Sequence, residues 1–119
     1  MRRMAWTTDI HLNFLGTQQI ETFLQSVNSQ QPDMLIISGD IGEAPSVYDY
    51  LRRIANTLDI PIYFVLGNHD FYHGGIQHVR TGIVTLIQDV ENLYWLNTES
   101  VIALTDDIAL VGHDGWSDG

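Results

Sequence analysis

The chain has 119 residues, of which 45% are hydrophobic, and its five basic and fifteen acidic side chains give a net charge of −10. This composition supports one folded domain with its own core and argues against a disordered chain. A surface of that charge repels phosphate backbones, which disfavours nucleic acid as a partner. Cysteine is absent, no apolar run is long enough to span a membrane, and the first residues lack a signal peptide's apolar segment, so we expect a cytoplasmic protein without disulfides.

Apolar residues recur along the chain with two alternating spacings, one typical of helices and one of buried strands. Val47, Leu51 and Ile54 share one helical face, whereas 34–38 is a continuous apolar run typical of a strand covered on both faces. In chain order we expect a strand over 2–8, a helix over 18–29, a strand over 34–38, a helix over 46–58, a strand over 61–66, a helix over 75–90, a strand over 93–96, and a hairpin of 101–104 with 108–112.

Strands that alternate with helices predict the α/β fold class, with a mostly parallel sheet flanked by helices. Thr17 is the expected N-cap of the first helix, because its side-chain oxygen can accept a hydrogen bond from the first turn. No repeat or linker divides the chain, so we expect one domain over residues 1–119. In a parallel sheet, ligands bind beyond the carboxyl ends of the strands. Candidate site residues should therefore follow the predicted strands.

Polar clusters do follow the first three predicted strands. Asp9-Ile10-His11 follows the first, and Asp9 and His11 can point to the same side because extended chain repeats every two residues. A carboxylate and an imidazole so placed suit a divalent metal. Asp40 follows the second strand and could bridge two metals, and Asn68 follows the third and offers an amide oxygen to the second metal. A glycine precedes Asp40 and another precedes Asn68, so the backbone can turn sharply there.

Two further side chains complete the third cluster, Gly67-Asn68-His69-Asp70. His69 has the character of a general acid, and the Asp70 carboxylate beside it could orient the imidazole and favour its protonated form. Taken alone, Asn-His-Asp could be a capping turn and Gly-Asp a simple turn dipeptide. The occurrence of all three clusters in order, each after a strand, favours a catalytic site over these structural interpretations.

The three clusters resemble the blocks D-x-H, G-D and G-N-H-D/E of the calcineurin-like metallophosphoesterase family. The resemblance implies that Asp9 and His11 bind one metal, that Asp40 bridges two metals and that Asn68 binds the second. The two divalent ions would be metals such as Mn, Fe or Zn. The implied fold is an α/β-sandwich of two mixed sheets flanked by helices, and this chain would form half of it.

The resemblance also implies an activity. The family hydrolyses phosphomonoesters or phosphodiesters by attack of a hydroxide that bridges the two metals, which also neutralise charge on the phosphoryl oxygens. His69 would be the general acid near the leaving group, and Asp70 would orient it. The expected partner is therefore a small phosphoester. Asp70 stands where the protein phosphatases of this superfamily have Glu, which disfavours a protein phosphatase.

The chain departs from the family pattern after the third block. The family continues with a later His and a G-H-x-H block, whereas here the histidine after His78 is His113, in Gly112-His113-Asp114. We therefore expect a truncated, partial domain whose activity is weak or absent, and whose exposed sheet drives formation of a homo-oligomer. The alternative is a non-catalytic protein-interaction module on the same fold. Retention of His69 argues for the enzyme, and the missing histidines argue for the module.

Overall fold

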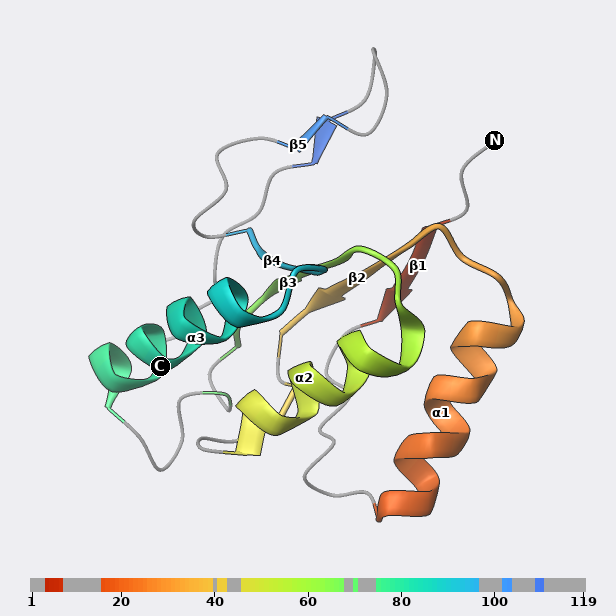
Figure 1. The fold of residues 1–119 in the computed structure, drawn as a ribbon, viewed down its shortest axis with the longest axis horizontal. Helices are drawn as coiled ribbons and strands as arrows, with labels where there is room; N and C mark the ends of the chain where they lie inside the picture. Colours follow the sequence, from red (N-terminus) through yellow and green to blue (C-terminus); the bar gives the residue numbers. More distant parts are fainter. Residues whose placement is uncertain are drawn as a thin grey trace.

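A computed structural model gives the fold of the protein (Figure 1). The structure describes residues 4–7, 16–39, 41–42, 46–67, 70, 75–96, 102–103 and 109–110. Its elements are β1 (Met4–Thr7), α1 (Thr17–Ser29), β2 (Met34–Ser38), α2 (Ser46–Leu58), β3 (Ile62–Val65), α3 (Ile76–Asp89), β4 (Leu93–Trp95), β5 (Ile102–Ala103) and β6 (Ala109–Leu110). Every predicted helix and strand is confirmed, with small differences at the ends.

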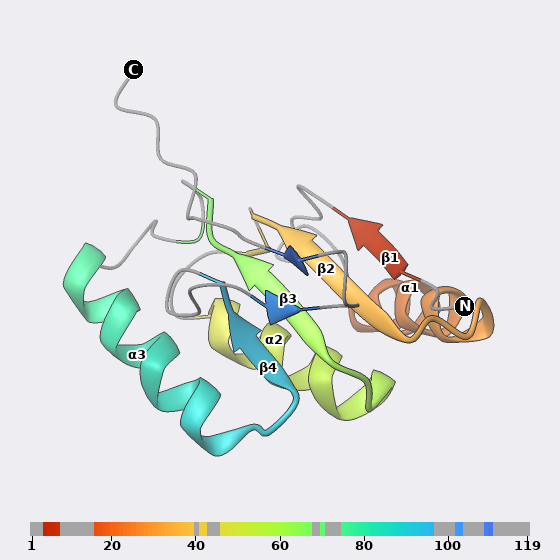
Figure 2. The same cartoon turned by 90° about the horizontal axis from the view of Figure 1, so that it is seen from above.

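The four strands β1 to β4 form one parallel sheet in which their spatial order follows the chain. Each connection carries one helix, and Figure 2 shows α1, α2 and α3 on the same side of the sheet. Right-handed crossovers between successive neighbours place every helix on one face. The predicted α/β class with a parallel sheet is thus confirmed, but the described helices cover only one face of β2, and Ile36 on its other face is half-buried.

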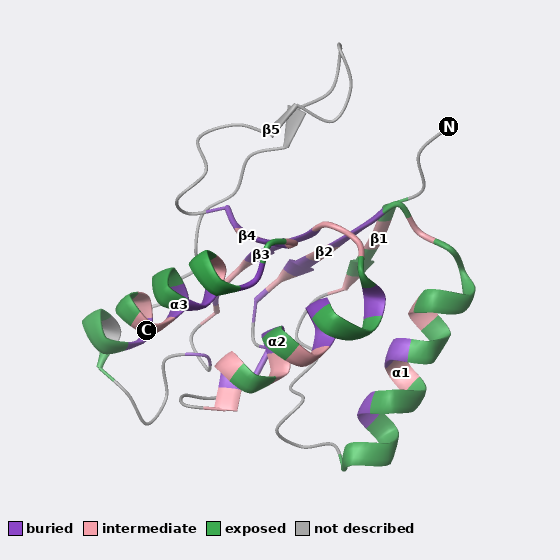
Figure 3. Ribbon diagram, viewed as in Figure 1, coloured by how far each residue is buried: buried purple, intermediate pink, exposed green. Residues whose placement is uncertain are grey.

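The main hydrophobic core lies between this face of the sheet and the three helices (Figure 3). The helices contribute their apolar stripes, and the strands contribute alternate residues, as the period of two requires. Among the fully buried members are Leu24, Leu51, Ile54, Ile83, Ile37, Phe64 and Trp95. A smaller cluster on the opposite face includes Met34 and Tyr63, whose ring stacks on Tyr94 with centroids 5.2 Å apart.

A side-chain hydrogen bond sets the start of α1, and residues with positive φ set the ends of α1 and α2. The N-cap of α1 is Gly16 and not Thr17, so that prediction was wrong by one residue. The reason is Gln19, whose side-chain Oε1 accepts the Gly16 N–H at 2.9 Å and thereby sets the first turn. Gln31 (φ 52°) and Asp59 (φ 51°) follow α1 and α2 in the left-handed region, which stops both helices.

The β5–β6 pair is antiparallel, as the predicted hairpin requires. None of the helices in the part of the chain that the structure describes is long and apolar enough to cross a membrane.

Candidate active site at the carboxyl ends of the strands

The carboxyl ends of β1, β2 and β3 lie side by side. Thr7 pairs with Ile37, and Ser38 pairs with Val65, so the three chains leave the sheet at neighbouring positions. The ends of β1 and β2 are also joined through side chains. The Trp6 indole N–H donates to the Ser38 hydroxyl oxygen at 2.9 Å, and the Ser38 hydroxyl lies 3.5 Å from the Thr7 carbonyl oxygen. No pattern in the sequence predicted this link.

Five of the predicted site residues lie outside the described residues: Asp9, His11, Asp40, Asn68 and His69. Their assignment as metal ligands and general acid therefore stays a prediction. Their neighbours in the chain are described, however. Gly39 and Ile41 flank Asp40, and Gly67 and Asp70 flank Asn68 and His69. The geometry of these four flanking residues shows how the two segments approach each other.

Gly39 brings the end of β2 against the end of β3. Its φ of +105° lies in the left-handed region, where a side chain would be strained, which confirms the sharp turn predicted before Asp40. A Cβ on Gly39 would lie 3.1 Å from the Gly67 nitrogen and 3.3 Å from the Gly67 Cα. The two backbones thus meet with no room for a side chain between them.

Asp70 joins the same two segments through its carboxylate. Oδ1 accepts the backbone N–H groups of Ile41 and Gly42, both at 2.8 Å, and Oδ2 accepts the N–H of Gly67 at 2.9 Å. The side chain is fully buried, and it is the one buried charged side chain of the described residues. A buried carboxylate is tolerated where several N–H donors replace its hydration, as these three do.

The segment after Asp40 is in turn fixed on the helical layer. Ile41 is fully buried in the main core. A Cβ on Gly42 would lie 2.6 Å from the ring atom Cδ2 of Tyr50, so the bare backbone of Gly42 packs directly on a side chain of α2. The position of residues 41–42 is therefore set by core packing as well as by Asp70.

The described residues contain no group of three or more His, Asp or Glu side chains close enough to hold a metal ion. The predicted donor set nonetheless fits a divalent cation by its chemistry, since carboxylates, an imidazole and an amide oxygen are ordinary ligands of such ions. Two of these predicted donors, Asp40 and Asn68, directly follow Gly39 and Gly67 in the chain, and the backbones of these two glycines are in contact.

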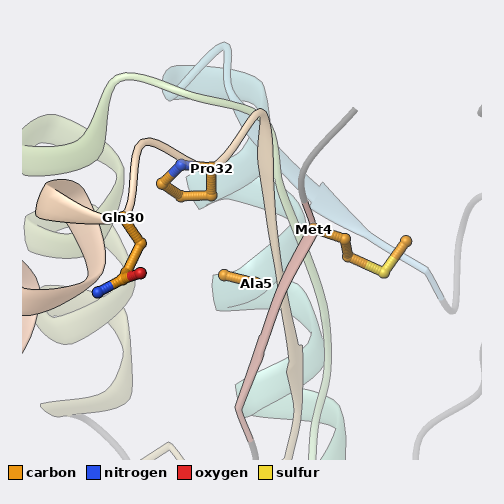
Figure 4. A pocket seen from close by; sticks show the side chains of 4 residues that line it. All are labelled: Met4, Ala5, Gln30 and Pro32. Atoms are coloured by element: carbon orange, nitrogen blue, oxygen red, sulfur yellow. The ribbon is translucent and has the colours of Figure 1, made fainter. Parts of the chain in front are cut away.

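A hollow of about 470 Å³ lies at the amino ends of β1 and β2, at the opposite end of these strands from the candidate active site (Figure 4). It is lined by Met4 and Ala5 of β1 and by Gln30 and Pro32, which precede β2. These residues stand at the amino ends of the strands and carry no acid or base. The hollow is therefore separate from the candidate active site.

The parallel α/β sheet agrees with the family resemblance predicted from the three motifs. The family model described as calcineurin-like phosphoesterase matches residues 2–118, so the chain belongs to the calcineurin-like phosphoesterase family. Members of this family generally use divalent metals. The family resemblance predicted from the three motifs is thereby confirmed.

Curated relatives match part of the chain. A protein of Pseudoalteromonas sp. named a probable cyclic nucleotide phosphodiesterase is 38% identical in an alignment that covers 57% of this chain and 31% of that protein. An uncharacterized metallophosphoesterase of Campylobacter jejuni is 30% identical over 60% of this chain and 20% of its own length. A transmembrane protein with a metallophosphoesterase domain from Danio rerio is 31% identical over 63% of this chain and 18% of its own. The chain thus spans a third or less of the length of these relatives.

Proposed function

We propose that this chain carries part of the active site of a metal-dependent phosphoesterase that acts on small phosphodiesters or phosphomonoesters. The observation that carries the proposal is the contact between the ends of β2 and β3, where Gly39 meets Gly67 and Asp70 bonds to both segments. This contact supports the proposal, because the two glycines follow neighbouring strands and α/β proteins bind ligands beyond the carboxyl ends of their strands.

In this proposal Asp9 and His11 hold one divalent cation, Asn68 holds a second, and Asp40 serves both. Bound divalent cations supply activation of water and neutralisation of negative charge on the phosphoryl oxygens. Manganese, iron and zinc all suit the donor set.

His69 is proposed to give a proton to the departing oxygen of the ester. Such general acid catalysis typically contributes about 10²- to 10⁴-fold to the rate. Asp70 is proposed to orient His69.

A small diester is the preferred substrate class. Two of the similar proteins, from Pseudoalteromonas and Synechococcus, are named probable cyclic nucleotide phosphodiesterases. The net charge of −10 disfavours a nucleic acid polymer, because a surface of that charge repels the phosphate backbone. A small phosphodiester carries little charge to repel.

The test combines metal content with turnover. The protein is loaded with Mn²⁺, freed of excess metal by desalting, and assayed with bis-p-nitrophenyl phosphate and p-nitrophenyl phosphate. His69→Ala is compared with His78→Ala, because His78 is an exposed residue of α3 outside the motifs. If these motifs suffice, we expect retained metal and weak hydrolysis of the diester, lowered by at least about 10²-fold in His69→Ala and unchanged in His78→Ala. No retained metal and no turnover would mean that the chain holds only an incomplete half of the site, and the non-catalytic interaction module would remain as the alternative.

A further inference from the structure

We draw no further inference here: the strongest candidate, the face of the parallel sheet that α1, α2 and α3 leave uncovered, where the side chains of Met4 and Trp6 on β1 are exposed, carries none because nothing in the described part of the chain shows what covers it.

Discussion

Replacing Gly39 by alanine tests the close approach of β2 and β3 most directly. The new methyl group meets two obstacles. The φ of +105° is strained for any residue with a side chain, at about 1–3 kcal/mol. The Cβ would also press on the backbone of Gly67 from 3.1 Å, and such overpacking costs about 1–3 kcal/mol. The expected loss in the free energy of unfolding is therefore about 2–6 kcal/mol.

That loss is a large fraction of what a chain of this size has. At about 0.05–0.15 kcal/mol per residue, the total is roughly 6–18 kcal/mol. Urea unfolding followed by tryptophan fluorescence measures the change as a lower midpoint at unchanged slope. The assay has a convenient signal, because Trp95 is buried in the main core.

Gly75→Ala is the matched control for Gly39→Ala. Gly75 has a φ of −74°, and a methyl group added there would have no neighbouring atom within 4 Å, so neither obstacle applies. It is the N-cap of α3, where alanine costs about 1 kcal/mol or less, partly offset by a less flexible unfolded chain. Losses of similar size in the two variants, or less than about 1 kcal/mol in Gly39→Ala, would refute the close approach.

Three further predictions use other described features. Among the described residues the buried Tyr48 hydroxyl has no hydrogen-bond partner, so Tyr48→Phe should raise the free energy of unfolding by about 1 kcal/mol, and a loss of that size in urea unfolding would contradict it. Burial also raises the pKa of Tyr48 above its ordinary value of 10.0, so the unfolded chain loses this proton at a lower pH than the folded protein does. The free energy of unfolding should therefore not change through Tyr48 below pH 10 and should fall as the pH rises further, and Tyr48→Phe should lose less stability between pH 10 and 11 in urea unfolding. The predicted self-association should involve the sheet edge at β1, which exposes Met4 and Trp6; sedimentation should show oligomers that Trp6→Gln weakens, and a monodisperse wild-type monomer would contradict it.

The helices were the most predictable part of the fold, because each has one apolar face. The residues that predicted the helix over 46–58 are the buried residues of α2, and its bounds agree. The errors occurred where polar contacts decide. The N-cap of α1 moved from Thr17 to Gly16 because Gln19 bonds to the Gly16 N–H, a contact that apolar spacing does not report.

The sequence predicted which strands precede the candidate site residues, but it did not predict the contacts between the segments that flank them. Asp40 and Asn68 were expected to follow the second and third strands, and these two strands, β2 and β3, do pair, with Ser38 opposite Val65. Two of the described partners of Asp70, Gly42 and Ile41, lie 28 and 29 residues away, whereas apolar periodicity indicates only which residues share a face of one element. The Trp6–Ser38 bond, 32 residues apart, was missed for the same reason.

The agreement between strand order and chain order has a consequence for how the protein is made. Met4 pairs with Met34, Leu35 with Ile62, and Ile62 with Leu93, so each new strand closes a loop of about 30 residues onto the strand made just before it. Within the four-stranded parallel sheet, every pairing joins a strand to the next one along the chain. The sheet can therefore be assembled strand by strand as the chain leaves the ribosome, each helix covering the pair beneath it before the next strand arrives.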